Sequence, residues 1–343
     1  MRSVTIKTTQ ALDKALPFNR PAVLIGDVAI DLFIAMSVVH RRELSKINRA
    51  TLLQGQSQVT IRGVSPFDRT DIQRYLDEFQ GESQESLLAF VDGNERLAWK
   101  LDEITIGSSV NPVRSLRDFY AFEQHVKTAN QNRGREVPEE WYEFPVFYFC
   151  NTSAIYGPDE VIPYPSYTDA LDYELEIACV IGKGGINIPA EKAEEYIFGF
   201  TIFNDWSARD VQRKEMKVGL GPAKGKDFAK SLGPYIVTLD ELADKHTGRA
   251  GVYDLEMVAR VNGVERSRGN MKDLYWSFGQ MIERASQDVM LQPGEVIGSG
   301  TVGTGCLLET TKGAGPWLQP GDVVELEIER LGVLRNTVGE RRK

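Results

Sequence analysis

Hydrophobic and polar positions divide the chain into two stretches of different character. In the first, the apolar runs 22–25 and 28–32 flank a Gly26-Asp27 turn, a pattern that predicts two short strands. A helix is expected to follow over 34–47, and a second one, which begins at a capping-type residue, over 68–79. These elements predict a small N-terminal α/β domain over residues 1–105.

The second stretch, residues 106–343, changes character near Val110-Asn111-Pro112 and alternates strand-like runs with Gly and Pro. β-Branched and apolar runs of strand length occupy 170–182, 196–204, 253–261 and 322–331. Helices are expected over about 114–129, 190–196, 207–214, 239–244 and 272–284. Because the helices fall irregularly between more numerous strands, the pattern disfavours a βαβ-wound sheet. The predicted class is α+β, mainly β.

Composition limits the kinds of partner that this chain can have. Of its 343 residues, 42% are hydrophobic and 26% are charged, values that are typical of a globular protein with a sizeable core. The formal net charge of −9 argues against nucleic acid and against an anionic membrane as the main partner. No apolar run reaches the length of a membrane span. A small anionic substrate stays possible, because a few cations can gather in a cleft.

The number and spacing of the cysteines indicate the cellular compartment in which the protein is expected. Cys150, Cys179 and Cys306 are widely spaced, form no CxxC pair and lie among apolar or small neighbours. They are interpreted as reduced core thiols. Together with an opening MRSVTIKTTQ that lacks a signal-like apolar region, they lead us to expect a cytoplasmic protein.

Two acidic motifs carry the candidate chemistry. Glu174 and Glu176 flank Leu175 on a predicted strand, so both carboxylates point to one face. Side by side they repel each other, and a divalent cation would offset both charges. Oxygen ligands suit hard ions such as Mg²⁺, Mn²⁺ or Ca²⁺. Taken alone, however, a Glu-x-Glu pattern is more typical of a solvated strand face.

The second motif is the string 202–210, in which an apolar strand runs into Asp205 and then into a helix. Helical spacing places Arg209 one turn after Asp205, and Gln212 on nearly the same side. The alternative is that Asp205 or Ser207 simply caps the helix. Helix capping accounts well for Asp205 or for Ser207 alone, but it accounts less well for the whole string 202–210.

With both motifs in view, the chain resembles the fumarylacetoacetate hydrolase family from about residue 110 to 331. The N-terminal domain is similar more weakly, through Gly26-Asp27 and Asp31-Leu32. The resemblance implies a mixed β-roll catalytic domain of the fumarylacetoacetase type over 106–343 and a homodimer. It also implies a metal-dependent hydrolase that cleaves a carbon–carbon bond in a β-diketo acid such as fumarylacetoacetate or an acylpyruvate.

The same resemblance implies the site residues. One divalent cation, first of all Mg²⁺ with Ca²⁺ or Mn²⁺ as alternatives, would be held by Asp118, Glu174, Glu176 and Asp205. Asp118 lies in the string 117–125, where its spacing to His125 matches the fumarylacetoacetase pattern. His125 and Glu309 match the family's water-activating pair, in which the carboxylate fixes the imidazole tautomer. The remaining catalytic and substrate-binding positions would be Arg209, Gln212, Lys226, Tyr120, Tyr148 and Thr301.

Two departures from the family pattern concern the far end of the substrate. After Lys226, a fumarylacetoacetase would carry Gly-Thr where this chain has Ala229-Lys230. The basic residue expected beyond the histidine has no match in register, although Arg133 and Arg135 flank its place.

Alternative enzymes on the same scaffold are an oxaloacetate-type decarboxylase, an isomerase and a sugar-acid dehydratase. A further alternative is a non-catalytic binding protein. Decarboxylases and acylpyruvases of the family carry a Glu three residues after the histidine, whereas this chain has Thr128. That difference favours hydrolysis.

Overall fold

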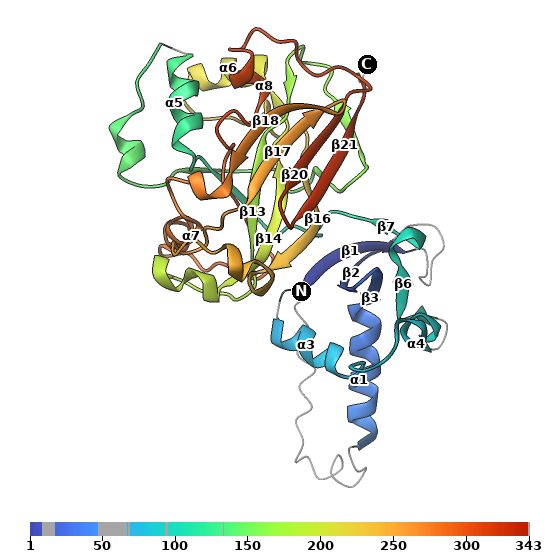
Figure 1. The fold of residues 1–343 in the computed structure, drawn as a ribbon. Coiled ribbons are helices and arrows are strands. Elements are labelled where there is room, and N and C mark those ends of the chain that lie inside the picture. Colours follow the sequence, from blue (N-terminus) through green and yellow to red (C-terminus); the bar gives the residue numbers. More distant parts are fainter. Residues whose placement is uncertain (9–17, 47–66, 68, 93–94, 133, 342–343) are drawn as a thin grey trace. The chain divides into compact units, whose positions relative to one another are not determined.

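The computed structural model describes residues 1–8, 18–46, 67, 69–92, 95–132 and 134–341. Two compact units divide the chain, one spanning Arg2–Ile106 and the other Gly107–Lys343. Both units appear in Figure 1, the smaller in blue to teal and the larger in green to red.

The smaller unit is an antiparallel sheet with helices. Its strands lie in the order β6 (Ala98–Lys100), β3 (Val28–Asp31), β2 (Phe18–Ile25) and β1 (Arg2–Thr8), and β7 (Thr105–Ile106) also pairs with β1. The helices are α1 (Leu32–Lys46), α3 (Arg69–Asp77) and α4 (Gln84–Ala89), with η1 (Leu101–Glu103) and the short ribbon β4 (Val91–Asp92) and β5 (Glu95–Arg96). The hairpin and both helices predicted from the sequence are confirmed. Side chains such as Ile30 and Tyr75 form its core.

The larger unit contains two sheets. In the first, the strand order is β16 (Lys230–Thr238), β14 (Ile197–Asn204), β13 (Leu175–Ile181), β19 (Val296–Gly298), β8 (Leu116–Phe119) and β9 (Phe147–Phe149), with β10 (Ile155–Tyr156) also on β16. In the second, the order is β11 (Val161–Tyr164), β21 (Gly332–Arg341), β20 (Val323–Ile328), β17 (Glu256–Val261) and β18 (Val264–Asn270). Ile177 and Ile202 of the first sheet share one buried apolar cluster with Met257 and Leu326 of the second. The unit is therefore a mixed α/β structure dominated by strands, as predicted.

Short helices complete this unit: α5 (Glu123–Gln131), α6 (Arg209–Val218), α7 (Phe278–Ser286) and α8 (Leu307–Thr310), with 3-10 turns η2 (Glu139–Tyr142), η3 (Ala190–Glu195), η4 (Leu239–Lys245) and η5 (Met271–Asp273). The α7 helix begins with a capping box in which Ser277 and Gln280 satisfy each other's backbone N–H groups. Gly219 ends α6 with a φ of 86°, a conformation that glycine adopts without strain. Figure 1 shows α5, α6 and α8 gathered at one end of the unit.

Two helix predictions need correction. The helix expected over 114–129 is wrong in its first part, because Leu116–Phe119 forms β8 and the helix α5 begins only at Glu123. All four side chains of β8 are buried, since this strand lies between β19 and β9. The helix expected over 272–284 begins at Phe278. Strands β13, β14, β17 and β20 confirm the predicted strand runs, whereas β16 and β21 were not predicted.

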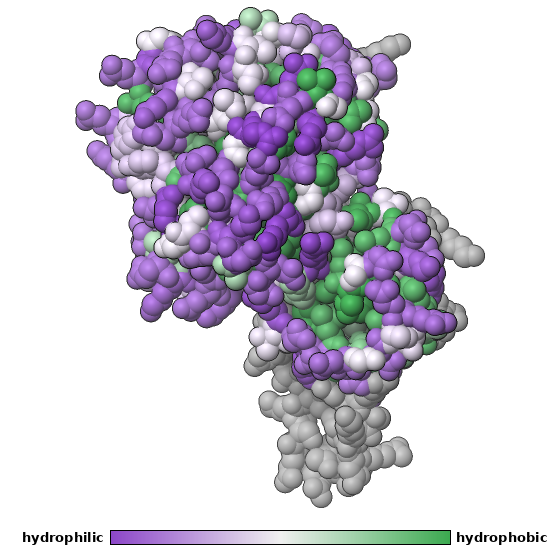
Figure 2. Space-filling view, in the orientation of Figure 1, coloured by the Kyte–Doolittle hydropathy of each residue, from purple (hydrophilic) through white to green (hydrophobic). Residues whose placement is uncertain are grey.

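Two further expectations concern the surface and the cysteines. All three cysteines are buried and unpaired, which confirms them as core thiols. None of the described helices has the length and apolar character needed to cross a membrane. The face of the larger unit seen in Figure 2 is mostly hydrophilic, as expected when its apolar side chains are buried.

Candidate active site

The two glutamates lie at the start of β13, a strand enclosed by β14 on one side and β19 on the other. Alternation along the strand sends Leu175 and Ile177 into the apolar core and Glu176 to the opposite face. Glu174 is only 4% exposed and Glu176 is 0% exposed. The interpretation of this motif as a solvated strand face is therefore wrong.

Two aspartates join the glutamates from neighbouring strands. Asp118 lies in β8, which runs parallel to β19, and Asp205 follows the last residue of β14. Because β8, β19, β13 and β14 are consecutive in the sheet, the four acids meet on one face of it. Carboxylate oxygens of Asp118, Glu174, Glu176 and Asp205 lie within 4.8 Å of one another, and all four side chains are buried.

The electrostatics of this cluster favour an added positive charge. Burial, together with the charge of Asp205, raises the pKa of Asp118 to about 8. Burial and the charges of Asp118 and Glu174 raise the pKa of Glu176 well above its ordinary range. One oxygen of Glu176, Oε2, is buried and has no hydrogen-bond partner among the described residues. An oxygen-only donor set with an unsatisfied carboxylate fits a hard divalent cation.

Two lysines and a tyrosine contact carboxylates of this cluster. Nζ of Lys226 contacts Oε2 of Glu174 and lies 2.8 Å from Oδ2 of Asp205. The hydroxyl of Tyr148 donates to the same Asp205 oxygen at 2.5 Å. Lys230, which the sequence associated with the far end of the substrate, is fully buried and contacts Oδ1 of Asp205. That expectation for Lys230 is wrong, because its charge is directed at an acid of the cluster.

The pair His125 and Glu309 is assembled from two helices. His125 lies on α5 and Glu309 on α8, and Nδ1 of the imidazole is 2.8 Å from Oε2 of the carboxylate. Both side chains are less than 10% exposed. Tyr120 packs its ring edge to face against the imidazole at 5.3 Å between centroids. The Sγ of Cys306 lies 3.7 Å from the same Glu309 oxygen. The imidazole thus lies between the carboxylate of Glu309 and the ring of Tyr120.

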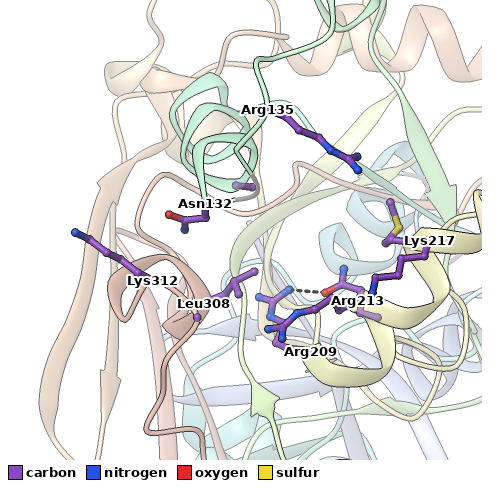
Figure 3. Close-up of a pocket in the computed structure, with 11 residues that line it drawn as sticks. Asn132, Arg135, Arg209, Arg213, Lys217, Leu308 and Lys312 are labelled. Carbon is purple, nitrogen blue, oxygen red and sulfur yellow. Dashed lines mark hydrogen bonds between the residues drawn. The ribbon is translucent and has the colours of Figure 1, made fainter.

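A cavity of about 360 Å³ connects these groups. All of the sequence-predicted site residues line it except Asp205 and Glu309, which contact Lys226 and His125 from outside. Nη1 of Arg209 lies 2.8 Å from Oε1 of Glu174 and donates to Oε1 of Gln212. Thr301 donates to Oε1 of Glu176 at 3.3 Å, and the backbone N–H of Gly300 donates to Asp118. Arg133 lies outside the described residues, and Arg135 lines a second cavity of about 530 Å³ rather than this one (Figure 3).

Sequence reasoning missed Asp172, which organises the site without lining the cavity. It is 0% exposed, and its carboxylate accepts from Nε of Arg209 and from the backbone N–H groups of Leu307 and Leu308. Leu307 and Leu308 begin the helix that carries Glu309. The sequence signal that could have indicated Asp172 is an acid two positions before the Glu-x-Glu pair. Its hydrogen-bond partners come from distant segments of the chain.

The fold and the site together define the class of this protein: an enzyme with a buried acidic cluster suited to a divalent cation. Residues 114–339 match the family model described as fumarylacetoacetate (FAA) hydrolase C-terminal, and the chain belongs to this family. The family includes hydrolases, isomerases and decarboxylases.

Relatives and solved structures agree with this assignment. An uncharacterised protein of Pyrococcus abyssi is 37% identical over 60% of this chain and 82% of its own length. An uncharacterised protein of Staphylococcus saprophyticus is 30% identical over 78% of this chain and 84% of its own. The crystal structure of 5-carboxymethyl-2-hydroxymuconate delta-isomerase from Mycobacterium smegmatis has a TM-score of 0.62 at 25% identity, and covers 100% of both chains. Fumarylacetoacetate hydrolase from Exiguobacterium antarcticum shares the fold, with a TM-score of 0.63 at 22% identity over 99% of this chain and 100% of its own.

Proposed function

We propose that this protein is a metal-dependent hydrolase that cleaves a carbon–carbon bond in a β-diketo acid, with water activated by His125 and Glu309. The supporting observation is the 2.8 Å approach of Glu309 to Nδ1 of His125, in the wall of the cavity that exposes the carboxylate cluster. A carboxylate on Nδ1 leaves Nε2 free to take a proton from water and stabilises the imidazolium that results.

The acidic cluster would hold the cation through Asp118, Glu174, Glu176 and Asp205, whose spacing and burial suit one ion. When bound, a divalent cation supplies Lewis-acid polarisation of the two ketone oxygens of the substrate. Magnesium is the first expectation, because four carboxylates and no nitrogen ligand suit a hard ion.

The proposed hydrolysis begins with proton transfer to His125. His125 accepts a proton from water, and the hydroxide oxygen adds to one ketone carbon to give a tetrahedral oxyanion. Collapse of this oxyanion breaks the bond to the central methylene carbon, which keeps the electron pair as an enolate. The proton held on His125 then returns to that carbon. The products are one carboxylic acid and one ketone, and no oxidant or reductant is consumed.

Cationic and hydroxyl groups of the chain would stabilise the charge that develops. Arg209, Gln212 and Lys226 line the cavity beside the acids, where low dielectric strengthens their interaction with an oxyanion or enolate. Tyr120, Tyr148 and Thr301 lie along the same wall and would orient the substrate. Lys226 is positioned to contact both a substrate oxygen and the cluster.

An isomerase is the second candidate, since the Mycobacterium smegmatis structure that matches over its full length is named as one. Isomerisation would use His125 to move a proton between carbon atoms without adding water. The two activities differ in their products, because only hydrolysis gives two molecules.

The proposal is tested by incubating the protein, loaded with Mg²⁺, Mn²⁺ or Ca²⁺, with acetylpyruvate, fumarylacetoacetate and oxaloacetate. Loss of the diketone ultraviolet absorbance and the appearance of two products are expected for at least one of the first two substrates. His125→Ala should abolish turnover, while the exposed His246→Ala serves as a matched control. Turnover of neither diketone by a protein shown to bind the metal would overturn the proposal.

A further inference from the structure

A second group of possible metal ligands contains nitrogen and sulfur as well as oxygen. Its members are His125, Cys306 and Glu309, whose ligand atoms lie within 4.8 Å of one another. Nδ1 of His125 is 2.8 Å and Sγ of Cys306 is 3.7 Å from Oε2 of Glu309. All three side chains are buried, with exposed fractions of 5%, 0% and 6%. The group shares no residue with the cluster of four carboxylates.

The chain brings these ligands together through two neighbouring helices. Cys306 immediately precedes α8 and Glu309 lies within it, so a spacing of three residues puts both side chains on one face of the turn. His125 comes from α5, which contacts α8 at one end of the unit (Figure 1). The carboxylate of Asp172 accepts from two backbone N–H groups at the start of α8 and thereby fixes this turn. The ligands are therefore held close together before any ion binds.

Two polar atoms of this group are unsatisfied. Nδ1 of His125 and Oε1 of Glu309 are buried and have no hydrogen-bond partner among the described residues. Burying a polar atom without a partner is costly. A cation between the two side chains would satisfy the nitrogen and the carboxylate at once, which is the observation that points to a ligand here.

The donor set selects a different ion from the one that suits the carboxylate cluster. Imidazole nitrogen and thiolate sulfur are preferred ligands of zinc, whereas Mg²⁺ prefers oxygen. Tetrahedral zinc, with bonds of about 2.0 Å to nitrogen and oxygen and about 2.3 Å to sulfur, places neighbouring ligand atoms about 3.3–3.6 Å apart. The distances of 2.8 Å and 3.7 Å to Oε2 of Glu309 lie on either side of this range. Small side-chain movements would close the site around Zn²⁺, with water as the fourth ligand.

We infer that His125, Cys306 and Glu309 form a second metal site, which takes Zn²⁺ and switches off the activation of water. Coordination through Nδ1 requires the imidazole proton to lie on Nε2, and the thiol proton of Cys306 leaves to solvent. Nε2 then has no lone pair with which to accept a proton from water. A thiolate and a carboxylate balance the two charges of the ion, which permits its burial. The site itself goes beyond the proposed function, whereas its inhibitory effect rests on that function.

Inhibition by Zn²⁺ in the presence of excess Mg²⁺ is the first test, with acetylpyruvate as substrate. Turnover by the wild-type protein should fall when Zn²⁺ is added and return when a zinc-selective chelator follows. In Cys306→Ala, the zinc concentration that gives half-inhibition should rise by at least tenfold, because even the outer partners of zinc ligands contribute tenfold or more to metal affinity. Cys306→Ser repeats the measurement with a side chain of nearly the same shape, which guards against a packing defect in the alanine variant.

The two other buried thiols provide matched controls. Cys179 lies in β13 and belongs to no group of possible metal ligands in the described part of the chain. Cys150 lies near Asp118 and Asp205 in a group that could also hold an ion. Cys179→Ala and Cys150→Ala should keep the zinc sensitivity of the wild-type protein. An active wild-type protein that Zn²⁺ does not inhibit, unchanged sensitivity in both Cys306 variants, or sensitivity lost in Cys150→Ala instead would each overturn the inference.

Cobalt absorption tests the site without turnover. Co²⁺ accepts the same kinds of ligand as Zn²⁺, and a cobalt–thiolate bond gives a charge-transfer band in the near ultraviolet. The Mg²⁺-loaded wild-type protein should gain this band on titration with Co²⁺, and both Cys306 variants should lack it. If neither diketone is cleaved but the band depends on Cys306, the proposed function fails and the second metal site stands. If no band forms, or if it persists in both Cys306 variants, the site is wrong.

Discussion

Asp172 and Arg209 form a buried pair in which Oδ2 of the carboxylate accepts from Nε of the guanidinium at 2.8 Å. The same oxygen accepts from the backbone N–H of Leu308 at 3.0 Å, and Oδ1 accepts from Leu307 at 2.9 Å. One carboxylate therefore connects the arginine in the cavity wall to the helix that presents Glu309. We expect Asp172 to act as a positioning residue, because within the described part of the chain it belongs neither to the cavity lining nor to the acidic cluster.

Replacing Asp172 with Asn should lower kcat by tenfold or more while changing KM less. The amide would present a donor where Oδ2 now accepts two hydrogen bonds, and a buried unsatisfied donor costs about 1–3 kcal/mol. Thermal unfolding and steady-state kinetics with acetylpyruvate measure both effects. Asp169→Asn is the control, since the contact of the Asp169 side chain within the described residues is an exposed ion pair with Arg341. Unchanged kcat in Asp172→Asn would show that the pair does not position the site.

Replacing Glu176 with Gln should weaken binding of the divalent cation by at least tenfold. The change removes one of four carboxylates that lie within 4.8 Å of one another, and the remaining amide is a weaker ligand for a hard ion. Calorimetric titration of the metal-depleted protein with Mg²⁺ and Mn²⁺ measures the affinity directly, without turnover. Glu191→Gln, an exposed acid of η3, serves as the control. Equal affinities in the wild-type protein and in Glu176→Gln would exclude this cluster as the metal site.

Asp210 should make stability depend on pH in a defined direction. Burial raises its pKa, but hydrogen bonds from Thr168 and from the backbone N–H groups of Asp169 and Val211 outweigh burial and lower the pKa below 3.8. A lowered pKa in the folded state favours the ionised form. Its contribution is therefore present above pH 3.8 and is lost as the pH falls through the folded-state pKa.

The variant Asp210→Asn should consequently be less stable than the wild-type protein at neutral pH, and the gap should narrow in acid. Urea unfolding at several pH values measures this gap. A gap that widens on acidification would contradict the assigned hydrogen bonds.

The residues of the acidic cluster could be predicted from the sequence more fully than the residues that surround the cluster. Glu174, Glu176 and Asp205 could be placed because strand alternation and a strand end are local features. Asp118 lies with the other three acids, but the sequence placed it in a helix, since the pairing of β8 with β19 joins segments about 180 residues apart. Pairing between such distant segments produces no local sequence pattern from which it could be predicted.

The residues that surround the acidic cluster were likewise not predictable from local sequence patterns. Lys230 follows Lys226 by four residues, yet only the path of β16 directs it to Asp205. Asp172 depends on the backbone N–H groups of Leu307 and Leu308, which no side-chain pattern can reveal.

The most direct test of the central proposal is the fate of solvent oxygen. The metal-loaded protein is incubated with acetylpyruvate in water enriched in the heavy oxygen isotope, and the products are analysed by mass spectrometry in wild type, Glu309→Gln and His125→Ala. Activation of water by His125 and Glu309 predicts one solvent oxygen in the carboxylic acid released by wild type, formed far more slowly by both variants. Conversion of the substrate without cleavage, or cleavage at the wild-type rate in His125→Ala, would contradict the account.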